Sequence, residues 1–350
     1  MTMRLVQLGL GGWGRSWVDE VARRTPGIVT VAWVDPDPTT RANAVAALAL
    51  PPERVFASLD AARAAVTADA ALIVVPLAAH AVAARSALEI GLDVLVEKPF
   101  TTTLAEAAAL VALARAGGRK LMVSQNYRWF AAPRLARRLI GAGAIGRPTA
   151  CYLDFHFYYG PGYRYFFLDE PLLSDMAIHH FDALRFVLGD EPVEVACQSW
   201  NEPESPFKGR PAAIVTVRMA GGTIVSYRGS WISRGPTTPY GGNWRIDGTA
   251  GAIEMAYRGA GELRERTDRL QLYGREGAPS EIALPAMQLM DRKGALDAFA
   301  QWVGGAAPGD GLSTGEDNLR SLALMFAAIR SASLGGAPVR IADVLAEVLP

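Results

Sequence analysis

The stretch LVQLGLGGWG near the N-terminus constrains the fold of this chain more than any other feature. Residues 4–8 have the composition of a short apolar strand, and they run directly into glycines. These glycines have the spacing GxGxxG: Gly9, Gly11 and Gly14. Large apolar side chains then recur every fourth residue, which predicts a helix over residues 13–24. The chain therefore begins with a strand, a tight glycine turn and a helix.

An acidic residue follows the second predicted strand. Residues 28–34 form that strand, and Asp35 stands at its end. This order is the fingerprint of dinucleotide binding, because the helix N-terminus binds the pyrophosphate and the carboxylate binds a ribose 2′-OH. Asp35 would repel a 2′-phosphate, so we predict NAD, and NADP stays possible because Arg41 follows nearby. The alternative is a plain glycine-rich turn that binds no ligand.

Strands and helices go on alternating through the first third of the chain. Helices are predicted over residues 41–50, 80–90 and 104–116, and strands over residues 70–75, 92–96 and 121–124. Such alternation is typical of a doubly wound parallel sheet. We therefore predict an N-terminal Rossmann domain over residues 1–125.

Ligands bind such sheets at the carboxyl ends of the strands. Three segments with polar or rigid residues are predicted there: 76–80, 97–99 and 125–128. In the second of them, Pro99 favours an extended conformation of Lys98. A lysine held in this way can stabilise a developing alkoxide. A surface ion pair between Lys98 and Glu97 is the alternative.

The pattern changes after residue 126. Strand-like alternation appears over residues 150–157, 193–200, 213–219, 223–231 and 243–247. This succession favours a large, open, mostly antiparallel sheet. The predicted fold class is therefore α/β, with an N-terminal doubly wound Rossmann domain and a C-terminal α+β domain over residues 126–350.

One predicted helix of the second domain carries a polar stripe. Its predicted N-cap is Ser174, and Gly189 is predicted to end it. At about 100° per residue, Asp175, His179 and Asp182 fall on one side of this helix. A histidine one turn from an aspartate is a natural general base, because the carboxylate orients the imidazole ring.

Two other interpretations of this stripe are open. In one, the stripe is simply the solvated face of an amphipathic helix. In the other, His179, His180 and Asp182 bind a metal ion, although adjacent histidines rarely face one ligand. We expect no metal, since the chain has only four histidines.

An aromatic segment precedes this helix, between residues 152 and 167. Its first part alternates, so Tyr152, Asp154, His156 and Tyr158 are predicted to share one face of a strand. This polar face suits a ligand rich in hydroxyl groups. The alternative is a core sheet whose tyrosine hydroxyls have partners within the protein.

The composition excludes several classes of partner. The 35 basic and 35 acidic residues balance, and no basic run with interleaved aromatic residues occurs, so we expect no nucleic-acid partner. No apolar run reaches the ~20 residues that span a bilayer, so we expect no membrane partner. Cys151 and Cys197 stand apart and are expected to be free thiols. The N-terminus lacks the layout of a signal peptide, and we therefore expect a cytoplasmic protein.

Taken in order, these motifs resemble one known family. They are GLGGWG, Asp35, VVPLAAH, VEKPF, QNYRW and the helix with Asp175, His179, His180 and Asp182. The set is similar to that of the glucose–fructose oxidoreductase/inositol dehydrogenase/rhizopine-catabolism (Gfo/Idh/MocA) family. The resemblance implies a Rossmann domain followed by an open-faced α/β domain. That second sheet often forms the oligomer interface, so a homodimer or homotetramer is expected.

The resemblance also implies an activity, which is NAD(P)-dependent oxidation of a secondary alcohol of a sugar, polyol or glycoside. The implied catalytic residues are Lys98, Asp175 and His179. Spacing and resemblance together give candidate cofactor residues, which are Gly9, Gly11, Gly12, Trp13, Gly14, Asp35, Pro76, His80, Glu97, Lys98 and Asn126. They also give candidate substrate residues, which are Lys98, Arg128, His156, Tyr158, Asp175, His179 and Asp182.

Three alternatives to a simple dehydrogenase are open. One is an NAD-dependent glycosidase, which oxidises the sugar transiently and releases free sugar without accumulating NADH. A second is a non-enzymatic sensor that binds a dinucleotide, although a sensor has no need for the set of Lys98, Asp175 and His179. A third is the reduction of a non-sugar carbonyl or imine. The substrate itself is not predicted.

Overall fold

The computed structural model describes residues 2–163, 165–259, 268–275 and 279–349. The chain divides into two compact units. Unit 1 comprises Met1–Asn126 and Leu289–Leu319, and unit 2 comprises Tyr127–Gln288 and Arg320–Pro350. The first boundary lies one residue beyond the expected one. The return of residues 289–319 to unit 1 was not indicated by the sequence.

Unit 1 is built on a six-stranded sheet in which every pair is parallel. The strands lie in the order β3 (Val55–Phe56), β2 (Ile28–Val34), β1 (Met3–Leu8), β4 (Ala70–Ile73), β5 (Asp93–Val96) and β6 (Leu121–Val123). This order is that of a doubly wound Rossmann sheet, so the predicted fold class is confirmed. All four residues of β4 and of β5 are buried, as expected where both faces of a parallel sheet are covered.

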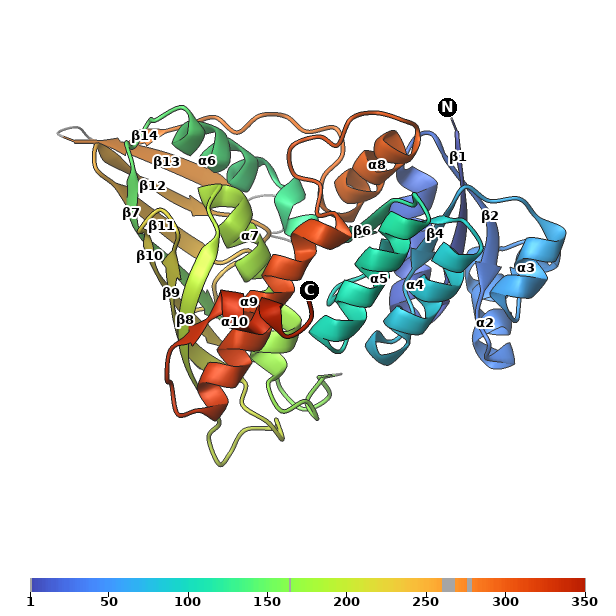
Figure 1. Ribbon diagram of the computed structural model, residues 1–350, viewed down its shortest axis with the longest axis horizontal. Helices are drawn as coiled ribbons and strands as arrows, with labels where there is room; N and C mark the ends of the chain where they lie inside the picture. Colours follow the sequence, from blue (N-terminus) through green and yellow to red (C-terminus); the bar gives the residue numbers. More distant parts are fainter. Residues whose placement is uncertain (1, 164, 260–267, 276–278, 350) are drawn as a thin grey trace. The chain divides into compact units, whose positions relative to one another are not determined.

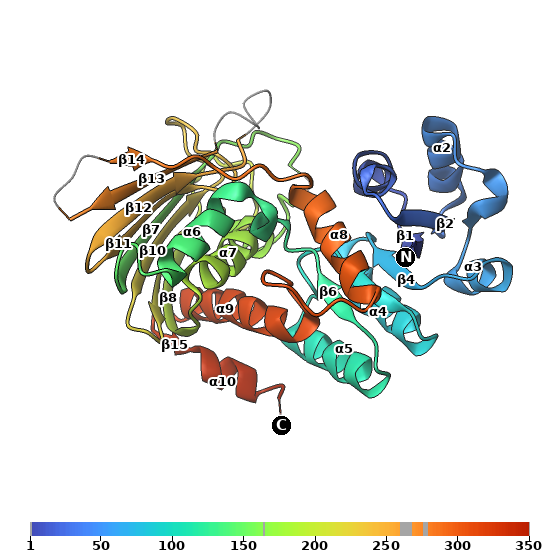
Figure 2. The same ribbon diagram turned by 90° about the horizontal axis from the view of Figure 1, so that it is seen from above.

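The helices of unit 1 connect these strands, and one returns from the far end of the chain. They are α1 (Gly12–Ser16), α2 (Pro38–Leu48), α3 (Leu59–Ala65), α4 (His80–Glu89), α5 (Leu104–Ala116) and α8 (Asp291–Val303). A π-helical turn (Trp17–Val21) and a 3₁₀ turn (Ala22–Arg24) extend α1, close to the predicted end of that helix. Figures 1 and 2 show α4 and α5 side by side.

Unit 2 is built on a nine-stranded sheet. Its strands lie in the order β14 (Ser280–Glu281), β13 (Arg269–Gly274), β12 (Gly251–Ala256), β11 (Asn243–Gly248), β7 (Pro148–His156), β10 (Ile224–Ser230), β9 (Ala212–Met219), β8 (Pro192–Trp200) and β15 (Val339–Arg340). The pairing is antiparallel except between β7 and β10, which are parallel. The predicted mostly antiparallel sheet is therefore confirmed.

Helices cover one face of this sheet. They include α6 (Ala131–Gly141) and α7 (Ile178–Leu188), and in the views of Figures 1 and 2 the described residues place no helix over the opposite face. The chain ends with α9 (Gly315–Ser333), which enters unit 2 at Arg320, and α10 (Ile341–Ala346). No described helix combines the length and apolarity needed to cross a membrane.

The helix that carries the predicted polar stripe starts earlier than its sequence indicated. A π-helical turn over Leu172–Ala177 leads directly into α7, so Ser174 lies inside the helix and is not its N-cap. The predicted end is confirmed, because Gly189 adopts the left-handed conformation with φ 61°. The turn therefore places Asp175 immediately before α7.

Candidate active site

The glycine turn after β1 has the geometry that its spacing predicts. Gly9 has φ +100°, and a Cβ atom there would lie 2.4 Å from the Val74 carbonyl oxygen. A Cβ on Gly14 would lie 2.2 Å from the Gly9 carbonyl oxygen, so both positions require glycine. A Cβ on Gly11 or Gly12 would meet nothing within 4 Å. This open backbone at the start of α1 fits the pyrophosphate of a dinucleotide.

A glutamine that the sequence did not single out holds this turn closed. The Gln7 Nε2 atom donates to the carbonyl oxygen of Gly9 at 3.0 Å and to that of Gly14 at 2.8 Å. Gln7 is fully buried in β1. A polar residue between the apolar Val6 and Leu8 was the available signal, because buried polar groups are kept where they form hydrogen bonds.

The carboxylate of Asp35 is fixed by backbone donors. The Leu10 amide donates to Asp35 Oδ2 at 2.8 Å, and the Asp37 amide donates to Asp35 Oδ1 at 3.0 Å. Arg41 Nη1 donates to the carbonyl oxygens of Asp35 and Pro36 at 2.7 and 2.9 Å. The carboxylate is thus oriented beside the glycine turn, while the Arg41 guanidinium bonds to the backbone behind it. This arrangement favours a ribose 2′-OH over a 2′-phosphate.

Replacing Asp35 with Ser should weaken NAD binding and narrow the preference for NAD over NADP. A hydrogen bond to a charged group contributes about 1.5–3 kcal/mol, so we expect the Kd for NAD to rise at least about tenfold. Calorimetric titration with each dinucleotide measures both constants. Asp37→Ser is the matched control, because Ser also caps α2 and should leave NAD binding unchanged. Unchanged NAD binding by Asp35→Ser contradicts the assignment.

The loop after β5 is anchored by Glu97. Its Oε1 atom accepts from the indole nitrogens of Trp13 at 3.1 Å and Trp17 at 2.7 Å, and its Oε2 atom accepts from the Lys98 amide at 2.9 Å. Glu97 is only 5% exposed. Glu97 therefore positions the backbone of Lys98, and its direct contact with the cofactor stays a prediction. The peptide bond between Lys98 and Pro99 is cis.

A second anchor for this loop is His80, which opens α4. Its Nδ1 atom lies 2.9 Å from the Pro99 carbonyl oxygen, and its Nε2 atom lies 3.0 Å from the Val75 carbonyl oxygen. Burial lowers the pKa of His80, and the nearby Glu97 opposes this shift. His80 thus ties the loop after β4, which includes Pro76, to the loop that carries Lys98.

Asp175 and His179 each contact an aromatic side chain of unit 2. The Tyr163 hydroxyl donates to Asp175 Oδ2. The His179 ring stacks on that of Tyr127, with 4.1 Å between centroids and 8° between planes. Every residue of α7 is buried, so the interpretation of this stripe as a solvated face is wrong. The sequence missed Tyr127 and Tyr163, although both lie in motifs that it marked as unusual.

Arg128 and Asp182 form a buried ion pair within unit 2. Arg128 Nε and Nη2 donate to the two Asp182 oxygens, each at 2.6 Å, and the Ser321 hydroxyl donates to Asp182 Oδ1 at 2.7 Å. Asp182 is fully buried. The carboxylate is committed to these partners, so the structure does not present it to a substrate as we expected. The pair instead links α7 to the segment after β6 and to α9.

His180 has a different environment from His179. Its Nε2 atom lies 2.9 Å from the Tyr240 carbonyl oxygen, and its Nδ1 atom lies 3.2 Å from the Tyr227 hydroxyl. Since a carbonyl only accepts, Nε2 carries the proton in the neutral ring. His180 and Asp182 therefore point to separate partners and do not form the metal site considered above. Within the described ranges no cluster of three potential ligands occurs.

The buried His180 should make the protein less stable in mild acid. Burial lowers its pKa to about 4 from the ordinary 6.5. Between these values the unfolded chain binds a proton that the folded protein does not, so the free energy of unfolding falls as the pH falls. From pH 7 to pH 5 this group should remove about 2 kcal/mol. Urea unfolding at both pH values measures the change, and His180→Gln should lack this part of it. An equal loss in the variant contradicts the prediction.

His156 and Tyr158 lie on the other face of the nine-stranded sheet from α7. Successive side chains of a strand point to opposite faces. Phe155 contacts His180 of α7 with 5.3 Å between ring centroids, so His156 points away from that helix. Tyr158 is 43% exposed, with the Arg234 guanidinium 5.7 Å from its ring centroid. The structure therefore does not bring these two predicted substrate residues together with His179.

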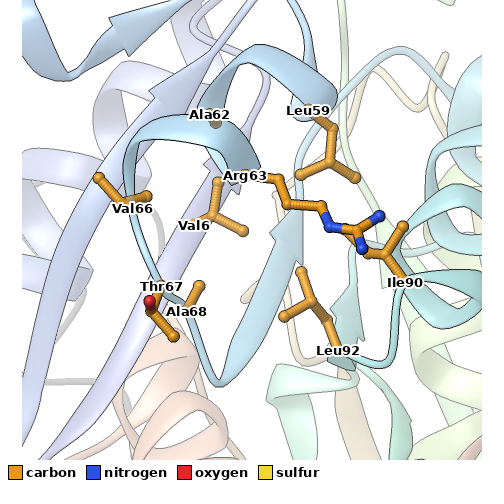
Figure 3. A pocket seen from close by; sticks show the side chains of 9 residues that line it. All are labelled: Val6, Leu59, Ala62, Arg63, Val66, Thr67, Ala68, Ile90 and Leu92. Carbon is orange, nitrogen blue, oxygen red and sulfur yellow. The ribbon is translucent and has the colours of Figure 1, made fainter.

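A cavity of about 240 Å³ lies elsewhere in unit 1. Its lining includes Val6, Ala68 and Leu92, and Figure 3 shows Arg63 of α3 extending toward Ile90. Ala68 and Leu92 come just before β4 and β5, at the amino ends of these parallel strands. The glycine turn follows the carboxyl end of β1. The cavity is therefore separate from the dinucleotide turn.

Two family models match most of the chain. Residues 3–125 match the oxidoreductase family with an NAD-binding Rossmann fold, and residues 134–254 match the GFO/IDH/MocA C-terminal domain. These matches agree with the geometry of the glycine turn and of Asp35. NAD is thus the cofactor of unit 1.

Individual relatives cover the chain more fully. An uncharacterized protein, y4oX, from Sinorhizobium fredii is 28% identical over 99% of this chain and 97% of its own length. A 1,5-anhydro-D-fructose reductase from Ensifer adhaerens is 29% identical over 72% of this chain and 74% of its own. The crystal structure of an inositol dehydrogenase homologue from Azotobacter vinelandii, complexed with NADH and myo-inositol, has a TM-score of 0.83 at 18% identity. It covers 97% of this chain and 98% of its own, and the likeness shows a shared fold.

Proposed function

Because the chain belongs to the Gfo/Idh/MocA family of oxidoreductases, we propose that it transfers a hydride between a secondary alcohol of a sugar, polyol or glycoside and NAD. The names of its relatives support this substrate class, since they include a reductase of an anhydro sugar and an inositol dehydrogenase homologue. When bound, the nicotinamide supplies the hydride acceptor at its C4 atom.

The residues of unit 1 bind and orient this cofactor. The backbone at Gly11 and Gly12 is open for the pyrophosphate, and the Asp35 carboxylate would accept from the adenosine ribose. Trp13 and the loop after β4 lie at the carboxyl edge of the sheet, where the nicotinamide half belongs. His80 and Glu97 hold the backbone around Lys98, so they act as positioning residues.

His179 is the general base of the proposed reaction. It accepts the hydroxyl proton as the C–H bond breaks, and it returns that proton in the reverse direction. Asp175 stabilises the imidazolium that forms, while the hydrogen bond from Tyr163 holds Asp175 in place. The stack on Tyr127 restricts the plane of the His179 ring and provides an electron-rich face for the developing cation.

Lys98 stabilises the other charge of the reaction. As the proton leaves the substrate hydroxyl, negative charge grows on that oxygen, and an ammonium group lowers the energy of this state. Lys98 follows β5 at the carboxyl edge of the Rossmann sheet, and its backbone is fixed by Glu97. A flexible lysine would lose part of its effect, because charge stabilisation depends on a preorganised position.

The observation that carries the proposal is that one chain contains both a glycine turn with the geometry of a dinucleotide site, in unit 1, and a helical segment with Asp175 and the buried His179 one turn apart, in unit 2. The test is a panel of sugars, inositols and glycosides incubated with NAD, in which NADH absorbance and free-sugar release are followed together. NADH formation with one class supports the proposal. Release of free sugar at constant NADH contradicts it in favour of the glycosidase activity, and tight NAD binding with neither signal contradicts the assigned substrate class.

The open face of the nine-stranded sheet is the proposed surface for self-association. Exposed side chains on its strands include Tyr152 on β7, Ile214 on β9 and Ile224 on β10. These apolar groups lie on the face over which the described part of the chain places no helix, and they suit burial against a second copy, as a homodimer or within a homotetramer. We also propose a cytoplasmic location, since Cys151 and Cys197 are free thiols.

A further inference from the structure

The helix α8 reaches the dinucleotide turn from the far end of the sequence. It begins at Asp291, in the part of the chain that follows β14, and it packs in unit 1 against β5 and the helical turns that follow α1. Asp291 has φ 59°, a conformation that is uncommon outside glycine. Its Oδ1 atom accepts from Asn126 Nδ2. The start of α8 is therefore held in a defined place in unit 1.

Arg292 uses this place to contact the helix that follows the glycine turn. Its guanidinium carbon lies 4.2 Å from the ring centroid of Trp13 and 5.4 Å from that of Trp17. Its Nη2 atom donates to the Ser16 hydroxyl and to Glu20 Oε2, each at 2.9 Å. Arg292 is only 5% exposed. Trp13 itself is 38% exposed, so the buried guanidinium lies over the indole from the protein side, where the ring face attracts a cation.

Trp13 is a side chain by which the middle of this turn can be anchored. Gly11, Gly12 and Gly14 surround it, and glycine backbone is the most mobile in the unfolded and locally open states. The indole nitrogen of Trp13 donates to Glu97, which also accepts from the Lys98 amide. One set of contacts therefore runs from α8 through Trp13 and Glu97 to the backbone of Lys98.

We propose that Arg292 is a positioning residue for NAD, which fixes Trp13 and thereby preorganises the glycine turn for the pyrophosphate. Preorganisation lowers the conformational entropy lost on binding, so it appears as affinity. Through Glu97 the same contacts set the position of Lys98. This second part rests on the proposed function, whereas the effect on NAD affinity does not.

The test measures NAD binding without any substrate. In Arg292→Met the side chain keeps its length but loses its charge and its hydrogen bonds, and we expect the Kd for NAD to rise about tenfold. Arg24→Met is the matched control, because Arg24 lies at the end of the same helical segment and forms an exposed ion pair with Asp19. The control should bind NAD as the native protein does. Calorimetry measures the affinity for NAD, and quenching of tryptophan fluorescence measures the affinity for NADH.

A double-mutant cycle separates positioning from a general loss of structure. If Arg292 acts through Trp13, Arg292→Met should add little to the loss of NAD affinity already caused by Trp13→Ala. Arg292→Lys, which keeps the charge but not the planar stack, should show an intermediate Kd and provides a second variant if Arg292→Met folds poorly. Native affinity in folded Arg292→Met, or full additivity with Trp13→Ala, overturns the proposal. Because no turnover is measured, these results stand whether or not hydride transfer occurs.

Discussion

Replacement of His179 with Gln lowers kcat by about 10²–10⁴-fold, which is the usual contribution of a general base. Gln resembles His in size and can keep part of the stack on Tyr127, but it cannot accept the hydroxyl proton. NAD binding should stay within about threefold of the native value, because the dinucleotide turn lies in unit 1. Steady-state kinetics with the substrate identified by the panel, together with NAD titration, measure both effects.

The control for this variant is His156→Gln. His156 lies on the face of the nine-stranded sheet opposite α7, so its replacement should leave kcat within about twofold. Comparison of the two variants separates the loss of a base from the loss of any histidine in unit 2. Near-native turnover by a folded His179→Gln enzyme shows that another group accepts the proton.

Replacement of Lys98 with Met lowers kcat/KM by about 10²–10³-fold. Removal of one group that stabilises a developing oxyanion typically costs about 3–4 kcal/mol. Met preserves the unbranched aliphatic stem, and the bonds of Glu97 to the Lys98 amide and to Trp17 involve no atom of the replaced side chain. The local backbone should therefore survive. Turnover at saturating NAD, measured over a range of substrate concentrations, separates kcat from KM.

Two further variants make the Lys98 result specific. Lys208→Met removes an exposed lysine of unit 2 and should leave the kinetics unchanged. Lys98→Arg keeps the positive charge in a larger group and should recover only part of kcat/KM. A Lys98→Met enzyme with native kcat/KM removes Lys98 from the mechanism.

Local sequence patterns were sufficient for the dinucleotide turn. Gly9 and Gly14 lie close to Val74, which follows β4, to Gln7 of β1 and to each other, and the GxGxxG spacing is typical of these close approaches. The alternation of strands and helices was likewise enough to predict a parallel sheet in unit 1. The glycine turn and the parallel sheet depend on residues that are close along the chain or on a recurrent supersecondary motif. Both can therefore be predicted from a single sequence.

Partners that are distant in sequence were not predictable in the same way. The stripe on α7 placed Asp182 beside His179, but the partners of Asp182 are Arg128, 54 residues before it, and Ser321, 139 residues after it. The periodicity of apolar and polar residues along a helix does not indicate contacts with residues this far away in the sequence. The return of α8 to unit 1, with Arg292 on Trp13, belongs to the same class.

Alternation along β7 showed the same limitation. It correctly grouped residues that share a face, but it did not tell which face α7 covers. The answer depends on Phe155 packing against His180, a contact between two separate elements. The polar residues of β7 therefore resembled a ligand-binding face, although they point away from α7. Alternation along a strand tells which side chains share a face. Packing against other elements decides whether that face is buried or can bind a ligand.

The most direct test of hydride transfer follows the hydrogen atom itself. A substrate found in the panel is prepared with deuterium on the carbon that bears the reacting hydroxyl, and the protein oxidises it with NAD. Direct hydride transfer predicts that one deuterium per turnover appears at C4 of the nicotinamide, with a slower rate than for the undeuterated substrate. Product formation with no deuterium in the reduced dinucleotide would contradict direct hydride transfer from the secondary alcohol.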